Sequence, residues 1–238
     1  MRYLDLTYPA PSANLACDEA LLDDCDRDPG AETLRFWEPA HYFVVLGYAN
    51  RAAREASLEI CRRENIGLYR RCSGGGAVLQ GPGCLNYSLV LRLESASGLQ
   101  TITQANRYIM ERQRQALATV LGRPVAVQGI TDLALDGLKF SGNAQRRKRN
   151  ALLFHGTFLL DFDLARVEKL LPMPSRQPDY RGNRGHRQFL TNLGVPPAFV
   201  KVALRQTWSA REPLISPPAI PSPLEQKYAS EDWNLRFL

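Results

Sequence analysis

Histidine and cysteine are scarce in this sequence. Its 238 residues include three histidines and five cysteines, and no two cysteines have the CxxC spacing that is typical of a zinc site. We therefore expect no metal site made of these residues. Cys17, Cys25 and Cys61 are expected to be buried or incidental thiols. Cys72 and Cys84 lie on either side of a glycine-rich segment and stay candidate nucleophiles.

Long apolar runs are absent as well. No stretch of about 18 apolar residues occurs, which is the length that a transmembrane helix needs, and Met1–Asp5 does not resemble a signal peptide. We expect a cytoplasmic protein without a membrane partner. With 45% hydrophobic and 23% charged residues, the chain has an ordinary globular composition, and its length suits one large domain.

Lysine is the third scarce residue. The chain has 5 lysines against 25 arginines, and its formal net charge is +6. An excess of positive charge favours anionic partners, such as nucleic acids, nucleotides or acidic proteins. Composition alone does not choose among these three classes.

Glycine, by contrast, is concentrated in one segment. Residues 70–78 read Arg-Arg-Cys-Ser-Gly-Gly-Gly-Ala-Val. Consecutive glycines lose much backbone entropy on folding, and a chain tolerates this cost where a ligand lies directly against its backbone. The guanidinium groups of Arg70 and Arg71 match carboxylate and phosphate geometry. The segment therefore indicates a site for a phosphorylated or acyl-phosphate molecule, with a simple tight turn as the alternative.

Hydrophobic periodicity predicts an α+β fold. Alternation and turn residues predict strands over residues 1–8, 33–37, 42–47, 67–71, 77–80, 86–93, 125–127, 132–135, 138–142 and 151–161. Apolar spacing and capping residues predict helices from Ser12 or Asn14 to Cys25 and over 50–64, 101–121, 197–209 and 223–229. We expect strands 33–37 and 42–47 to pair, Asp136-Gly137 to form a hairpin turn, and helices to flank a mixed, largely antiparallel β-sheet.

Residues 172–187 have a different composition. They are rich in proline, arginine and glycine, so we expect a long functional or mobile loop. No internal repeat is visible, and we expect a single domain over residues 1–238.

Two later segments place polar residues inside predicted strands. Lys139 lies between Leu138 and Phe140, and its compact charge suits a phosphate whose charge redistributes. An edge-strand lysine that prevents aggregation is the alternative. His155 precedes a strand glycine, which often marks the close approach of another group. A hydrogen-bonded core histidine would have the same sequence context, and Asp132 would also suit a simple hairpin strand.

Three of these segments carry a family resemblance. RRCSGGGAV, DGLKFSGNAQRR and FHGTFLL, in this order, resemble the signature blocks of the lipoate–protein ligase A family, which is related to biotin–protein ligases and octanoyltransferases. Residues 177–193 and 227–234 resemble further blocks of the same ligases. The resemblance spans most of the chain and implies a biotin/lipoate ligase-like catalytic domain.

The resemblance implies a two-step reaction. Lipoate attacks the α-phosphate of ATP, in a reaction that uses Mg²⁺, and a lysine of an acceptor lipoyl domain then takes the lipoyl group from lipoyl-AMP. Lys139 would be the catalytic residue that contacts the carbonyl and phosphate oxygens. The residues expected along the acyl-adenylate are Arg70, Ser73, Gly75, Gly76 and Ala77. Those expected to line the same cleft are Asn86, Asp132, Ser141, Ala144, His155, Gly156 and Thr157.

The sequence departs from the family pattern in two places. Many bacterial relatives continue into a C-terminal accessory domain, whereas this sequence stops after Trp233–Leu238, so we expect no such domain and consider a separate accessory subunit. Residues 80–84 also stand where many relatives have an acidic or histidine-containing turn. Residues 146–149 form a basic cluster, which would be a solvated loop or an electrostatic guide for an acidic lipoyl domain.

The sequence leaves three other functions as alternatives. An octanoyltransferase would move octanoyl from acyl carrier protein through a cysteine thioester, but residues 127–132, where cysteine-dependent members carry their nucleophile, contain no cysteine. Only Cys72 and Cys84 would then be available. A biotin ligase also has a glycine- and arginine-rich loop, but the form found here fits the lipoate branch better. A basic nucleic-acid-binding module has no accompanying binding motif.

Overall fold

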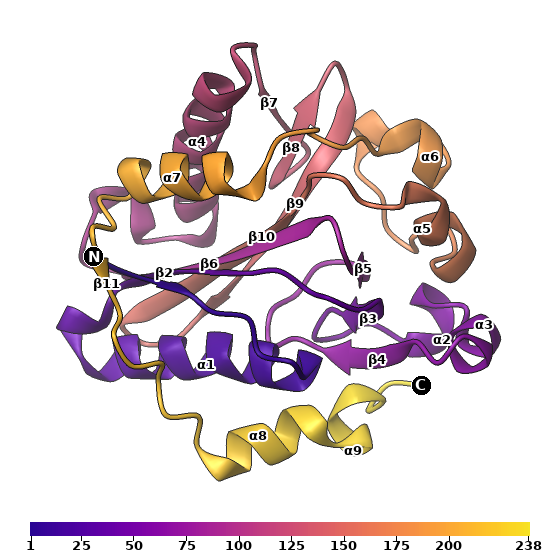
Figure 1. Ribbon diagram of the computed structural model, residues 1–238, viewed down its shortest axis with the longest axis horizontal. Coiled ribbons are helices and arrows are strands. Elements are labelled where there is room, and N and C mark those ends of the chain that lie inside the picture. Colours follow the sequence, from indigo (N-terminus) through magenta and orange to yellow (C-terminus); the bar gives the residue numbers. More distant parts are fainter.

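The computed structural model describes residues 1–238, and it contains two β-sheets that helices surround (Figure 1). The main sheet has eight strands in the order β11-β1-β2-β6-β10-β9-β8-β7, and the smaller one has the order β4-β3-β5. The strands are β1 (Arg2–Asp5), β2 (Thr33–Trp37), β3 (Phe43–Leu46), β4 (Gly67–Arg70), β5 (Val78–Gln80), β6 (Cys84–Arg92), β7 (Ala126–Gln128), β8 (Asp132–Leu135), β9 (Leu138–Arg147), β10 (Ala151–Leu159) and β11 (Glu212–Pro213).

The sheets are mixed and largely antiparallel, which confirms the predicted α+β class. In the main sheet only β1 runs parallel to its two neighbours, while the pairs from β2 to β7 are antiparallel. Asp136 (φ 49°) and Gly137 (φ 77°) link β8 to β9, and positive φ at both positions is the requirement of the favoured two-residue hairpin turn.

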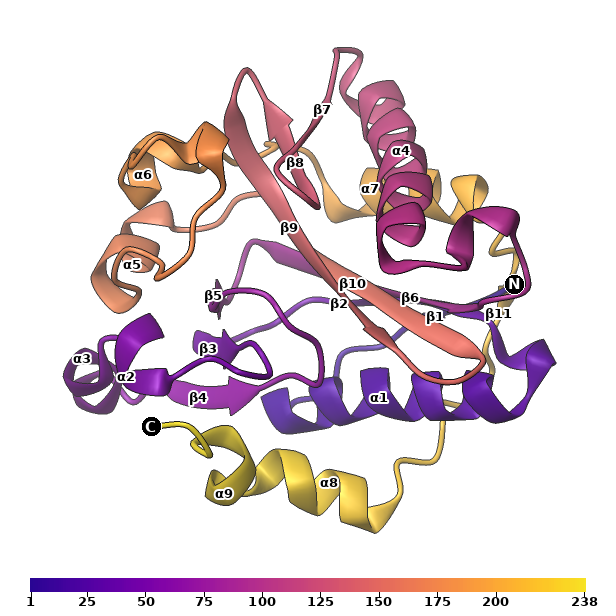
Figure 2. The same cartoon turned by 180° about the vertical axis from the view of Figure 1, so that it is seen from behind.

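Helices cover both faces of the main sheet. The helix α1 runs along one face, and α4 and α7 lie on the other (Figures 1 and 2). The α-helices are α1 (Pro11–Arg27), α2 (Ala52–Glu55), α3 (Leu58–Arg63), α4 (Ile102–Leu121), α5 (Leu164–Leu170), α6 (His186–Phe189), α7 (Pro197–Thr207), α8 (Ser222–Ala229) and α9 (Glu231–Asn234). The 3₁₀ helices are η1 (Pro29–Ala31), η2 (Ser97–Leu99) and η3 (Asp179–Arg181).

The long helix α4 begins and ends where the sequence predicts. Thr101 and Gln104 form a capping box at its start, and Gly122 adopts a left-handed conformation after its last turn. Ala105, Ile109 and Ala116 lie on its buried apolar face. Ile102 is 58% exposed, because it lies in the first turn beyond the edge of the core.

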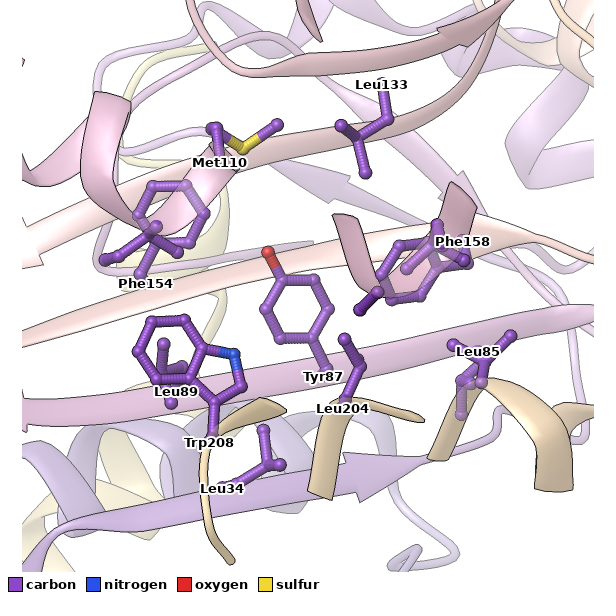
Figure 3. Close-up of a cluster of buried hydrophobic side chains, with 14 of the residues drawn as sticks. Leu34, Leu85, Tyr87, Leu89, Met110, Leu133, Phe154, Phe158, Leu204 and Trp208 are labelled. Carbon is purple, nitrogen blue, oxygen red and sulfur yellow. The ribbon is translucent and has the colours of Figure 1, made fainter. Parts of the chain in front are cut away.

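The largest core cluster fills the space between the main sheet, α4 and α7. Tyr87 of β6 lies in the middle of this cluster, with Phe154 and Phe158 of β10 on either side (Figure 3). The rings of Tyr87 and Phe158 stack with their centroids 5.2 Å apart. On the opposite face, Leu21 and Leu22 of α1 pack in a second cluster. The main sheet is therefore buried on both sides.

The prediction that strands 33–37 and 42–47 pair is wrong. Strands β2 and β3 do not pair, since β2 lies between β1 and β6 while β3 lies between β4 and β5. The link between them, residues 38–42, contains a proline and no glycine or asparagine, so it lacks the residues of a tight hairpin. The chain uses this link to pass from one sheet to the other.

The helix predicted over residues 50–64 is two short helices, α2 and α3. They are separated at Ala56 and Ser57, where the backbone N–H of Ser57 donates to the carbonyl of Leu170 in α5, 2.9 Å away. This bond to another element replaces the one that a continuous helix would make. Asn50 does not cap α2, because its side chain accepts from the N–H of Gly47 at 2.7 Å.

Each of the five lysines is paired with a carboxylate in the folded chain. The pairs are Lys139–Asp132, Lys148–Asp23, Lys169–Glu64, Lys201–Asp5 with Glu38, and Lys227–Glu19. None of the helices combines the length and the apolar character that crossing a membrane requires.

Candidate active site

A cavity of about 860 Å³ lies between the two sheets and the segment 172–187. Its size is in the ordinary range for a small-molecule site. Eleven of the thirteen predicted site residues line it: Gly75, Gly76, Ala77, Asn86, Asp132, Lys139, Ser141, Ala144, His155, Gly156 and Thr157. The structure thus brings together residues from three distant parts of the sequence. Arg70 and Ser73 are not in the lining.

The glycine segment presents its backbone to the cavity. Gly74, Gly75 and Gly76 are exposed, and their N–H groups have no acceptor within the protein. A Cβ atom added to Gly74 or Gly76 would meet nothing within 4 Å, so neither glycine is required by contacts inside the protein. Exposed backbone donors with open space in front of them suit a bound anion.

The prediction for Arg70 disagrees with the structure. Its side chain is fully buried, and its Nη1 donates to the carbonyls of Gly47 (2.8 Å), Tyr48 (3.2 Å) and Asn50 (2.9 Å). Its Nε donates to the carbonyl of Trp233 at 3.1 Å. Arg70 holds four backbone carbonyls and is not among the residues that line the cavity.

Arg71 binds the backbone of the glycine segment. Its Nη2 donates to the carbonyls of Gly74 and Gly76 at 2.6 and 2.8 Å, and its Nε donates to Ser73 Oγ at 3.2 Å. Burial lowers the pKa of this guanidinium to about 10, so it stays charged at neutral pH. Because Arg71 turns these carbonyls inward, the neighbouring N–H groups are left for a ligand.

Ser73 and His155 belong to a buried chain of polar groups. His155 Nε2 lies 2.5 Å from Ser73 Oγ, and His155 Nδ1 lies 3.6 Å from Asp18 Oδ2. The other oxygen of Asp18 accepts from Arg35 at 2.6 Å, with both side chains almost fully buried. Burial raises the pKa of Asp18, but Arg35 and His155 outweigh it and the net pKa is lowered, so the carboxylate is ionised. Both ring nitrogens of His155 therefore face protein groups.

Lys139 is held beside the cavity by an acidic partner. Its Nζ lies 2.8 Å from Asp132 Oδ1, and its side chain is 27% exposed. The other oxygen of Asp132 accepts from the Tyr180 hydroxyl at 2.8 Å. Burial and the Asp132 charge raise the pKa of Tyr180, so this hydroxyl stays protonated. A Cβ added to Gly142 would lie 2.8 Å from the Lys139 ammonium, so glycine leaves room for the lysine there.

Asn86 and Thr157 form a closed ring with Gln80 on the cavity floor. Thr157 Oγ1 donates to Asn86 Oδ1 (2.6 Å), the Asn86 amide donates to Gln80 Oε1 (2.9 Å), and the Gln80 amide donates to Thr157 Oγ1 (2.7 Å). A Cβ added to Gly156 would overlap the side chain of Asn143, so this glycine allows Asn143 to approach β10.

The sequence prediction missed several site residues. Asp18, Gln80, Asn143 and Tyr180 all line the cavity. Asp18 had a detectable signal, since it is a charged residue among the apolar positions of α1 that become buried. Tyr180 had none, because its role depends on where the segment 172–187 folds.

The rest of the lining is largely apolar. Side chains from both sheets, from α1 and from α5 and α6 contribute to it: Leu15, Trp37, Val45, Val78, Leu79, Ile130, Leu159, Phe162, Val167, Leu171, Phe189 and Leu190. Such a wall suits a hydrocarbon chain, whereas the glycine N–H groups and the lysine suit an anionic head group. The cavity can therefore hold a molecule with both parts.

No thiol reaches this cavity. All five cysteines are buried and free, and none is among the lining residues. Burial raises the pKa of Cys72 and of Cys84 to about 12, so both are protonated at neutral pH and are poor nucleophiles. The structure also contains no group of three or more histidine, cysteine, aspartate or glutamate side chains arranged for a metal ion.

Sequence comparison finds relatives along most of the chain. Residues 10–196 match the model of the lipoyl protein ligase A/B catalytic domain. A probable lipoate-protein ligase A of Mycoplasma pneumoniae is 26% identical, over 98% of this chain and 71% of that protein. The octanoyltransferase LipM of Geobacillus kaustophilus is 28% identical, over 79% of this chain and 75% of that enzyme.

Solved structures agree with the sequence matches. A lipoate-protein ligase A bound with ATP has a TM-score of 0.82 and 26% identity, covering 100% of this chain and 99% of that one. A bi-partite lipoate protein ligase of Thermoplasma acidophilum, described with its E2 lipoyl domain, has a TM-score of 0.81 and 26% identity, covering 100% and 96%. The chain folded around this cavity therefore belongs to the lipoyl protein ligase A/B catalytic domain family.

Proposed function

We propose that this enzyme is an ATP-dependent lipoate–protein ligase. The observation that carries the proposal is the composition of one cavity, which joins an apolar wall, free backbone N–H groups and Lys139 and contains no thiol. An acyl-adenylate has an apolar acyl chain, which suits the wall, and carbonyl and phosphate oxygens, which suit the N–H groups and Lys139. The ATP-bound relative and the ligase described with its lipoyl domain support the same choice of substrates.

The proposed reaction has two steps. In the first, a carboxylate oxygen of lipoate attacks the α-phosphorus of ATP, and the bond to the β-phosphate oxygen breaks, which gives lipoyl-AMP and pyrophosphate. In the second, the neutral amine of an acceptor lysine attacks the acyl carbon of lipoyl-AMP. The bond to the phosphate oxygen breaks, AMP leaves, and the amine loses a proton as the amide forms.

Both steps build negative charge on oxygen atoms next to the acyl carbon or the α-phosphorus. The glycine N–H groups and the Lys139 ammonium are fixed donors that meet this charge without reorganising. A donor of this kind is typically worth about 3–4 kcal/mol in the transition state. We assign transition-state stabilisation to Lys139, and ligand contact to Gly75, Gly76 and Ala77.

Magnesium enters the proposal as part of the substrate. The cavity offers Mg²⁺ no cluster of three acidic or imidazole groups, and Asp132 is already shared by Lys139 and Tyr180. Mg²⁺ commonly binds through substrate phosphates with one or two carboxylates. A cavity with so few free acidic groups suits a metal that arrives bound to ATP.

The second candidate function is octanoyl transfer from acyl carrier protein to a lipoyl domain. Octanoyltransferases are among the relatives, and the apolar wall would hold an octanoyl chain equally well. A cysteine thioester, however, would need a thiolate in the cavity, and Cys72 and Cys84 are buried outside it. We therefore rank this function second.

The partner assignments follow from the reaction. The acceptor is a lipoyl domain, and the basic cluster at residues 146–149 offers an acidic domain a complementary surface. The bi-partite relative supports testing a separate accessory subunit for the activation step. The single-domain organisation and the cytoplasmic location expected from the sequence stay predictions.

One experiment separates the two candidate functions. The pure chain is incubated with a lipoyl domain and either lipoate plus MgATP or octanoyl–acyl carrier protein, and the acceptor is weighed by mass spectrometry. We expect a lipoyl mass gain in the first mixture and none in the second. The reverse result would establish octanoyl transfer, and a Cys72→Ser, Cys84→Ser double variant would then show whether a thioester is involved.

A further inference from the structure

Residues 180–191, at the end of the segment 172–187 and just after it, are attached to the hairpin that carries Lys139. Three hydrogen bonds join them: Tyr180 Oη to Asp132 Oδ2 at 2.8 Å, Arg184 Nη2 to the carbonyl of Gly137 at 3.1 Å, and the N–H of Thr191 to the carbonyl of Lys139 at 2.9 Å. The segment therefore contacts the start, the turn and the lysine of the β8–β9 hairpin.

Asp132 is shared between this segment and the lysine. Its Oδ1 pairs with Lys139 Nζ, and its Oδ2 accepts from Tyr180. The Asp132 side chain is only 13% exposed, so water does not easily replace a lost donor. If the tyrosine hydroxyl were absent, the carboxylate would be free to rotate and to engage the ammonium with both oxygens.

Tyr180 itself is held in place. Its ring packs against Phe189 with the centroids 5.1 Å apart, and its carbonyl accepts from Arg184 Nη2 at 2.9 Å. Neither of these two contacts involves its hydroxyl. A Tyr180→Phe change removes one hydrogen bond and leaves the packing.

We infer that Tyr180 is a positioning residue for Lys139 and acts through Asp132. Its hydroxyl occupies one carboxylate oxygen, so Asp132 holds the ammonium through the other oxygen alone. The remaining N–H bonds of Lys139 then stay directed at the cavity. This inference rests on the proposed role of Lys139 in stabilising charge on the reacting oxygens.

The test is the steady-state rate of lipoyl-domain modification by Tyr180→Phe. We expect kcat to fall about tenfold, as loss of a hydrogen bond to a charged group would cause, with KM for lipoate and for ATP changed by less than about twofold. Tyr108→Phe is the matched control. The Tyr108 hydroxyl makes no hydrogen bond and the residue lies on α4 outside the cavity, so this variant should have the wild-type rate.

A double variant separates positioning from direct ligand contact. In an Asp132→Asn background, Tyr180→Phe should cause no further loss of kcat, because the carboxylate on which it acts is gone. Losses that multiply, or a change in KM alone, would mean that Tyr180 contacts the ligand itself, and the inference would be overturned.

A spectroscopic readout does not depend on activity. The chain has only five lysines, so the Cε resonances of ¹³C-lysine-labelled protein can be assigned by single substitutions. We expect Tyr180→Phe to shift the Lys139 resonance and leave that of Lys201 in place. An unshifted Lys139 resonance would overturn the inference. Wild-type activity in Tyr180→Phe with an inactive Lys139→Ala would refute this inference alone, while an active Lys139→Ala would refute the proposed function.

Discussion

Arg35, Arg70 and Arg71 use their guanidinium groups inside the protein. Each binds backbone carbonyls or a buried carboxylate, and Arg71 binds the carbonyls of Gly74 and Gly76. The two arginines before the glycines favour an anion site, which stays a prediction, but in the structure both guanidinium groups bind backbone carbonyls. A sequence gives the charge of a side chain, whereas the direction of that side chain depends on which face of β4 is buried.

Lys139 offers the most direct test at the scale of single residues. We expect Lys139→Ala to reduce lipoyl transfer by at least about a hundredfold, since it removes a preorganised cation from the site. Its unfolding transition should stay close to that of the wild type, because the side chain is partly exposed. Mass spectrometry of the acceptor and thermal unfolding measure the two effects.

Lys201→Ala is the matched control, since it also breaks an ion pair, with Asp5 and Glu38, but lies outside the cavity. Turnover in Lys139→Ala equal to that in Lys201→Ala would remove Lys139 from the mechanism.

At the scale of elements, the sequence predicts most helices and strands and the β8–β9 hairpin, but it does not predict the partners of β2 and β3. Helix α4 was predictable because its caps and its apolar stripe are local signals. The separation of β2 from β3 was not, because pairing is decided by contacts with β4, β5 and β6 that lie far along the chain. For the same reason, Tyr180 could not be assigned to the site before the segment 172–187 was placed.

The glycine segment allows a paired prediction. Gly76→Ala should leave the unfolding temperature unchanged, because a Cβ there meets nothing in the protein, but it should raise KM for lipoate or ATP by crowding the ligand. Gly47→Ala should instead lower stability, because its Cβ would overlap the backbone oxygen of Gly75. Calorimetry and steady-state kinetics of both variants provide the comparison. A stable, fully active Gly76→Ala would argue against ligand contact at this glycine.

The helix α6 gives a pH-dependent prediction. Burial lowers the pKa of His186, whose Nε2 donates to the carbonyl of Pro172 at 3.1 Å. Below the unfolded pKa of about 6.5, the unfolded chain takes up a proton that the folded chain resists, so folding stability falls with pH in this range. The wild type should therefore lose more of its Tm between pH 7.5 and 5.5 than His186→Gln does.

The exposed His41 supplies the control for this comparison, since His41→Gln should behave like the wild type. Equal losses of Tm in wild type and His186→Gln would rule out this histidine as a cause of acid sensitivity.

At the scale of the whole molecule, the last residues of the chain support the glycine segment from outside. Helices α8 and α9 lie beside α1 and β4, far from the segment in sequence (Figures 1 and 2). The Trp233 indole donates to the carbonyl of Arg70 at 2.8 Å, and Asn234 Oδ1 accepts from the N–H of Arg70 at 2.8 Å. The end of the sequence thus fixes the strand that leads into the site.

Removing residues 231–238 should therefore destabilise the whole fold. Three of the hydrogen bonds lost join Trp233 and Asn234 to Arg70. With about 1 kcal/mol for each of these three, we expect the free energy of unfolding to fall by at least about 3 kcal/mol, as measured in urea. Removing only Leu238, which is 68% exposed, should have no measurable effect. Equal stability of the two truncated chains would show that these contacts contribute nothing.

The pairing of every lysine has a consequence for an enzyme that makes a reactive anhydride. A free amine on its own surface would compete with the acceptor for the acyl group. Each of the five lysines is held in an ion pair with a carboxylate, so its nitrogen lies against that carboxylate and is not free to reach an acyl carbon. The other 25 cationic side chains are arginines, which stay protonated. On the proposed function, the enzyme is therefore protected from acylating itself.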